Sequence, residues 1–147
     1  MRRFRFSLES VLVVRKKTLE DERIKLASIM NIYNRQLDVL NEMNFRLEEL
    51  RIESQKHLEN NEFNPQVIAN YNSYSYKLLQ DIKTQSLIIE KTKVDLEHQQ
   101  ELAKDAYIKV KSLENLKEKQ KQQYEREVLQ EEFKMMDDIV NSRRTIA

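Results

Sequence analysis

The absence of glycine is the feature that most limits what this chain can fold into. Its 147 residues include no glycine and only one proline, whereas average usage of roughly 7% would supply about ten glycines. Because glycine adopts positive φ most easily, the chain lacks the common material for tight hairpin turns and phosphate-binding loops. Glycine-dependent nucleotide motifs are therefore excluded, and the scarcity of helix breakers favours long helices.

The rest of the composition describes a polar chain of balanced charge. Charged residues make up 35% of the sequence, hydrophobic residues 39%, and the formal net charge is +1. This mixture favours helices with salt-bridged faces and a narrow apolar seam over a self-repelling disordered chain. The chain has no cysteine, which excludes disulfides and thiolate metal sites. No apolar run approaches the ~20 residues of a membrane span and no secretory signal follows Met1–Arg3, so we expect a cytoplasmic protein.

Two segments carry apolar residues at the three- and four-residue spacing of an amphipathic helix. The first predicts a helix over about residues 7–59, with Ser7 as a candidate N-cap. Its heptad positions include Leu12, Leu19, Leu26, Met30, Tyr33, Leu37, Leu40 and Leu47. The second predicts a helix over about residues 66–141, with heptad positions that include Leu78, Ile82, Gln85, Ile89, Thr92, Leu96, Gln99, Ala103, Ala106, Val110 and Leu113. Both patterns are typical of an imperfect coiled coil.

One turn-like cluster separates the two segments, at about residues 60–65. Pro65 disfavours helix at Asn64 and suits the first turn of the following helix, so Asn64 is the expected N-cap. A single break between two long helices predicts an all-α fold, with residues 1–147 forming one antiparallel coiled-coil hairpin. In this register Leu12 lies opposite Leu113.

The predicted register leaves residues 123–147 as a C-terminal helical overhang beyond the start of the first helix. Its apolar residues then have no partner within the chain: Leu129, Phe133, Met135, Met136, Ile139 and Val140. An apolar face of this kind indicates binding to another protein. A second copy of the chain and a frayed end are the alternatives.

The chain offers no arrangement of residues suited to catalysis. His57 and His98 are expected on the order of 40 Å apart along the hairpin, so they cannot share a metal ion. Carboxylates on solvated helix faces lack the desolvated pocket that acid–base chemistry needs, and a two-helix coiled coil offers no enclosed pocket. We predict a protein that is not an enzyme, needs no cofactor or metal, and acts by binding other proteins.

The N-terminal segment is basic and interleaved with apolar residues. Six arginines and lysines lie within the first 17 residues, among Phe4, Phe6 and Leu8. Such an end could attract nucleic acid, anionic lipid or an acidic protein surface. Because Glu20–Glu22 are acidic, we expect an acidic protein surface, no nucleic acid, and at most peripheral membrane contact.

An aromatic cluster follows the turn. Tyr71, Tyr74 and Leu78 share one helix face. They either close the end of the seam, opposite Arg46–Glu53, or form an exposed docking patch, because aromatic residues are enriched at interface hot spots.

Three short motifs occur in order along the chain. They are Phe4-x-Phe6-x-Leu8-x-x-Val11-Leu12-x-x-Arg15, then Asn70-Tyr71-x-x-Tyr74-x-x-x-Leu78, and finally Lys134-Met135-Met136-Asp137-Asp138. With the length and the single central break, they make the whole chain resemble the flagellar FliJ family of export-apparatus proteins. Tyr74 stands where phenylalanine is common in that family.

The resemblance implies a non-enzymatic part of the flagellar type III export apparatus, which supports flagellum assembly and hence motility and chemotaxis. Family members resemble the central stalk of rotary ATPases: one end enters the hexameric export ATPase ring, and the other contacts the cytoplasmic domain of the membrane-embedded export gate and substrate chaperones. At the ATPase end would lie Phe4, Phe6, Leu8, Leu12, Arg15, Met135, Met136 and Asp137. At the gate and chaperone end would lie Tyr71, Tyr74 and Leu78. The alternatives are the equivalent stalk of a virulence secretion system and a generic cytoplasmic coiled-coil scaffold or tether.

Overall fold

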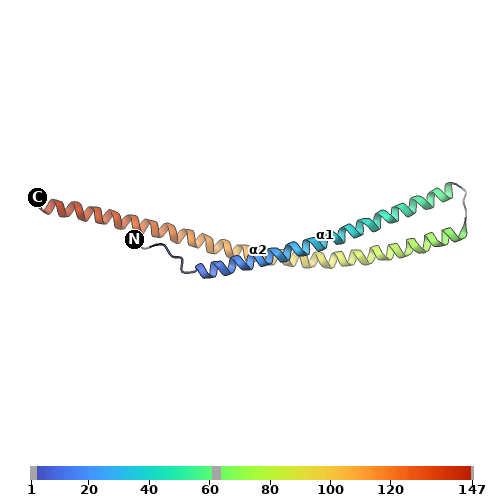
Figure 1. The fold of residues 1–147 in the computed structure, drawn as a ribbon, viewed down its shortest axis with the longest axis horizontal. Coiled ribbons are helices and arrows are strands. Elements are labelled where there is room, and N and C mark those ends of the chain that lie inside the picture. The colour runs from blue at the N-terminus through green and yellow to red at the C-terminus, as the bar shows by residue number, and fades with distance from the viewer. Residues whose placement is uncertain (1–2, 61–63, 147) are drawn as a thin grey trace. The chain divides into compact units, whose positions relative to one another are not determined.

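The computed structural model describes residues 3–60 and 64–146 of the chain. In these residues it contains two α-helices and no strand (Figure 1). Helix α1 spans Glu9–Glu59 and has 51 residues, and helix α2 spans Pro65–Ile146 and has 82. The helices pack against each other, which confirms the predicted all-α fold of two long helices. Neither of them, within the described residues, has a stretch apolar enough to cross a membrane.

The helix ends follow local rules of capping. Pro65 is the first residue of α2, and the Asn64 side-chain oxygen accepts a 3.0 Å hydrogen bond from the Gln66 backbone nitrogen. Asn64 is therefore the N-cap, as predicted. Helix α1 begins at Glu9, two residues after the candidate cap Ser7, and α2 continues to Ile146, beyond the predicted end near residue 141. Of the predicted turn over residues 60–65, positions 61–63 lie outside the described residues.

The chain divides into two compact units, which we describe separately. The terminal unit comprises Met1–Glu22 and Ala103–Ala147, and the turn unit comprises Arg23–Leu102. Each unit joins part of α1 to part of α2, so each depends on residues that are distant in the sequence. That residues 1–147 act as one domain stays a prediction.

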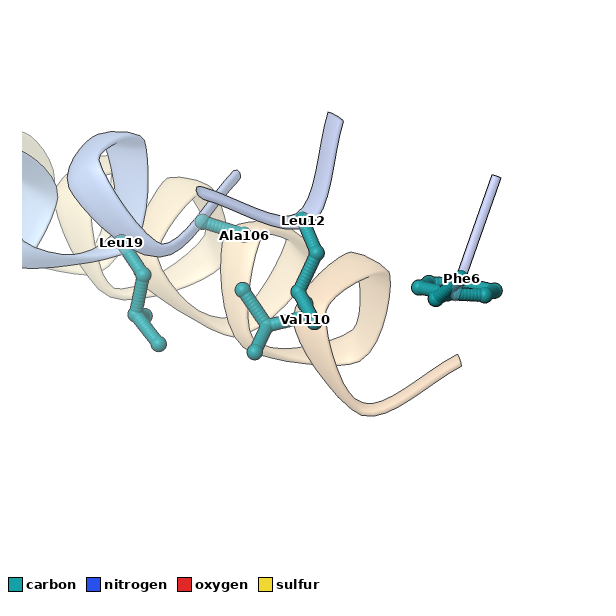
Figure 2. Close-up of a cluster of buried hydrophobic side chains, with 5 residues drawn as sticks. All are labelled: Phe6, Leu12, Leu19, Ala106 and Val110. Atoms are coloured by element: carbon teal, nitrogen blue, oxygen red, sulfur yellow. The ribbon is translucent and has the colours of Figure 1, made fainter. Parts of the chain in front are cut away.

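The terminal unit holds an apolar core where the two helices meet (Figure 2). Its buried side chains are Phe6, Leu12, Leu19, Ala106 and Val110, and Phe4 and Leu113 pack against them. Ala106 and Val110 on α2 have small side chains. Leu12 and Leu19 of α1 can therefore lie close to α2. Leu12 is only 1% exposed, and burying a leucine fully contributes about 1.5–3 kcal/mol.

Ion pairs between the helices flank this core. Lys117 Nζ lies 2.8 Å from Glu9 Oε2, and Lys16 Nζ lies 3.9 Å from Glu114 Oε1. Because both pairs connect the start of α1 to the same stretch of α2, they agree with the expected register in which Leu12 lies opposite Leu113.

The turn unit has a seam in which polar and apolar residues alternate. Leu50, Leu78, Ile89 and Leu96 are buried, but so is Gln99. Gln85 Nε2 donates a 3.0 Å hydrogen bond to the backbone carbonyl oxygen of Gln36. The side-chain oxygen of Gln36 is buried, with no hydrogen-bond partner among the described residues.

Candidate functional site

The N-terminal motif residues divide into buried and accessible groups within the terminal unit. Phe6 and Leu12 lie in the apolar core, where they attach the start of the chain to α2. Leu8 remains 36% exposed, and Arg15 is partly exposed. The sequence motif thus combines residues that hold the segment in place with residues that a partner can reach.

Phe4 makes an aromatic contact that sequence reasoning missed. Its ring centroid lies 5.8 Å from that of Tyr124, with the planes tilted by 45°, a geometry that stabilises aromatic pairs. The exposed Arg3 and Arg5 flank Phe4, and Glu127 lines the same shallow hollow, whose volume is about 430 Å³. The contact fixes the entry of the chain onto α2, next to the start of the C-terminal overhang.

In the structure, the part of α2 that follows Tyr124 comprises residues 125–146, and from here on we call this segment the C-terminal overhang. Every described side chain from Leu129 to Thr145 is exposed. The large apolar side chains are between 49% and 66% exposed: Leu129, Phe133, Met135, Met136, Ile139 and Val140. Four of them, at 129, 133, 136 and 140, follow the spacing of a single helix face. Asp137 and Asp138 lie beside this face and are also exposed.

The second candidate surface belongs to the turn unit. Tyr74 is 44% exposed and Tyr71 is half-buried, whereas Leu78 is buried in the seam. The guanidinium carbon of Arg46 lies 5.7 Å from the centroid of the Tyr74 ring, within the range of a cation–π interaction. A side-chain contact with Tyr74, and then one with Glu49, raises the pKa of Arg46.

A cleft between α1 and α2 adjoins these tyrosines. It has a volume of about 640 Å³, and its lining includes Leu50, Leu58, Val67, Ile68 and Tyr71, with Arg46, Glu53 and His57 as ionisable groups. The cleft is open to solvent. No group of three or more metal-ligating side chains occurs in the described part of the chain. The cleft therefore offers apolar contacts to a partner.

The structure thus gathers the predicted residues into two sets, one in each unit. Heptad position could have identified Leu12 as a core residue, whereas Phe6 precedes α1 and has no heptad position. The pair formed by Phe4 with Tyr124 had no such signal, because it depends on which residues face each other across the two helices. The pair formed by Arg46 with Tyr74 agrees with the expectation that the tyrosines close the seam opposite Arg46–Glu53.

Comparison with known proteins gives a match to a protein family. The model of a protein family described as FliJ, the flagellar FliJ protein, matches residues 4–145. No curated protein and no solved structure gives a significant match. The family match includes all the residues of both candidate surfaces.

Proposed function

The chain belongs to the flagellar FliJ family, and from that premise we propose that it is a helical stalk of the flagellar type III export apparatus. Family membership makes it a flagellar export-related protein and a non-catalytic component of that apparatus. We propose more specifically that the terminal unit binds the hexameric export ATPase. The turn unit binds the cytoplasmic domain of the export gate or substrate chaperones.

The exposed apolar face of the overhang carries this proposal. A helix face with Leu129, Phe133, Met136 and Val140 in water is unfavourable unless a partner covers it. The ring of an oligomeric ATPase provides a central opening into which one helix end can fit. Met135 and Asp137 would border the contact, on the sides of the same helix.

The start of the chain provides further residues for the same contact. Phe4 packs on Tyr124, directly before the overhang. Leu8 and Arg15 are accessible to the partner, while Phe6 and Leu12 act indirectly by holding the segment on α2. A partner that binds the overhang can therefore contact the N-terminal motif as well.

The turn unit supplies the second contact. Tyr74 presents an exposed ring edge beside Arg46, and the adjoining cleft has an apolar floor. Tyr71 lines this cleft, and Leu78 is buried in the seam of the same unit. Such a surface fits an apolar segment of a gate or chaperone protein, and it would hold the stalk at the inner face of the membrane at the flagellar base.

The stalk would act without hydrolysing anything itself. Helix α2 contributes to both units without a proline or glycine in its interior, and such helices resist the kinks that would absorb movement. Two binding surfaces on one chain also raise the effective concentration of each partner for the other.

A binding assay with the export ATPase of the same organism tests this function. The full chain should bind the ATPase and alter its hydrolysis rate. Deletion of residues 129–147, or the pair Phe133→Asp and Met136→Asp, should abolish both effects. Asn141→Asp adds a charge on the polar side of the same overhang and serves as the matched control.

Tyr74→Ala separates the two proposed surfaces. It should retain the ATPase interaction and lose binding to the cytoplasmic domain of the gate or to chaperones. If the folded full chain binds no export ATPase, a generic coiled-coil scaffold becomes the better interpretation.

A further inference from the structure

The C-terminal overhang carries two adjacent methionines, Met135 and Met136. Met135 is 66% exposed and Met136 is 64% exposed. Of the other methionines in the described helices, Met30 is 43% exposed and Met43 is half-buried. Every described side chain in residues 129–145 is exposed, so packing within the chain does not shield either sulfur of the overhang from a solute.

Thioethers are the only sulfur groups of this chain, because it has five methionines and no cysteine. A thiolate would react readily with a peroxide and would compete with the methionines. Without one, mild oxidation falls on the thioethers, and the accessibility of each sulfur decides the order in which they react. We therefore expect the overhang methionines to react before those at positions 30 and 43.

The two overhang methionines differ in their position around the helix. Met136 lies on the apolar face that Leu129, Phe133 and Val140 also occupy. Met135 is turned away from Met136 by about 100° around the helix axis, so it lies to the side of this face. A partner that covers the apolar face would bury the Met136 sulfur, whereas the Met135 sulfur would border the contact.

We propose that the overhang is a site of reversible methionine oxidation, and that the sulfoxide at Met136 blocks the contact with the apolar partner. The partner is the export ATPase, so this inference rests on the proposed function and adds a way to regulate it. Hydrogen peroxide is the oxidant: one of its oxygen atoms bonds to the Met136 sulfur as the O–O bond breaks. The sulfur gives up two electrons, and the other oxygen leaves as water.

The sulfoxide acts on the contact through its polarity. Oxidation turns the apolar side chain of Met136 into a polar one, and an apolar partner surface offers the new oxygen no hydrogen-bond donor. Burying a polar group without a hydrogen bond is unfavourable, so the oxidised face should release its partner. At Met135 the oxygen can stay in water, and its effect on binding should be small.

Mass spectrometry of the free full chain tests the site without a partner. After brief treatment with dilute hydrogen peroxide, Met135 and Met136 should each gain one oxygen before Met30 and Met43 do. Tandem spectra of the tryptic peptide 135–143 distinguish the two adjacent positions. Oxidation of the half-buried Met43 as fast as that of Met136 would overturn the assignment of the site.

Binding to the export ATPase tests the effect of the sulfoxide. Oxidation should weaken binding of the parent chain by about tenfold or more. Met136→Leu keeps an apolar side chain of similar volume, so this variant should bind both before and after oxidation. Met135→Leu is the matched control and should lose binding on oxidation as the parent does. If oxidised Met136→Leu loses binding to the same extent, the proposal is wrong.

Circular dichroism separates a blocked contact from an unfolded overhang. The oxidised chain should keep its helical content, and a loss of helix would overturn the proposal that the sulfoxide acts at the contact. Methionine sulfoxide reductases with a dithiol should restore binding, as the thiols become a disulfide and the sulfoxide oxygen leaves as water. Binding that does not return would contradict reversibility.

The two proposals can fail separately in these experiments. If the untreated, folded chain binds no export ATPase, the proposed function fails, and the blocking effect of Met136 fails with it. If the untreated chain binds and the oxidised chain binds equally well, the stalk proposal stands and the regulatory one is overturned. Bound ATPase should also slow the oxidation of Met136 and leave that of Met30 unchanged. Equal rates at Met136 with and without the ATPase would show that the partner does not cover this sulfur.

Discussion

The seams of the two units show two ways to join the same pair of helices. In the terminal unit, Leu12 and Leu19 of α1 meet Ala106 and Val110 of α2, and the buried side chains of this core are all apolar. In the turn unit, buried leucines and isoleucines share the seam with Gln36, Gln85 and Gln99. Apolar burial supplies most of the stabilisation in a coiled coil, whereas buried polar groups restrict register at a cost in stability. The terminal unit is therefore expected to hold the helices together, and the turn unit to align them.

Removal of a core side chain in the terminal unit should have the largest effect. Leu12→Ala deletes a side chain that is 1% exposed, and it should lower the free energy of unfolding by about 2–5 kcal/mol. Denaturant unfolding followed by circular dichroism measures the change. Val14→Ala, on the exposed side of α1, should stay within about 0.5 kcal/mol. A similar loss in both variants would contradict the assignment of the core.

Removal of a buried polar group from the turn unit should act in the opposite direction. Gln36→Leu replaces a side chain whose oxygen is buried without a partner in the described structure. Because an unsatisfied buried group costs about 1–3 kcal/mol, the variant should be more stable by about 1 kcal/mol. Gln55→Leu, at an exposed position of the same helix, is the control. If Gln36→Leu lowers the free energy of unfolding, the glutamines of this seam stabilise the fold in addition to restricting the register of the helices.

The ion pair between Glu9 and Lys117 should contribute less to the free energy of unfolding than these buried side chains do. Both side chains are partly exposed, and such pairs contribute about 0.2–1 kcal/mol. A double-mutant cycle with Glu9→Gln and Lys117→Gln isolates the pair, because the interaction of Glu9 with the helix dipole cancels in the cycle. The coupling should fall at high salt. A coupling that salt leaves unchanged would argue against an electrostatic origin.

The smallest effect on stability is expected from the ion pair between Glu48 and Arg51, within α1 of the turn unit. Hydrogen bonds from Arg51 lower the pKa of Glu48 below its ordinary value. A depressed pKa in the folded state means that the contribution to stability is present above the unfolded-state pKa and is lost as the pH falls through the folded value. An NMR titration of the Glu48 carboxyl should show the lowered pKa, and Arg51→Gln should return it toward normal. An unshifted titration in the parent chain would refute the pairing.

The sequence by itself determined the helices and the family. The absence of glycine, the heptad spacing and the single Pro65 predicted two long helices, one break and the Asn64 cap, because these signals act through the local backbone. Three short motifs predicted the FliJ family, and the match over residues 4–145 confirmed it.

Only the tertiary structure decided which residues are accessible. Phe6 and Leu12 belong to the same motif as Leu8 and Arg15, but the first two are buried against α2 while the others face solvent. The cleft beside the Arg46–Tyr74 contact also had no sequence signal. The reason is physical: heptad spacing defines the face of a helix, whereas burial and ring contacts depend on the side chain that the other helix brings to the same level.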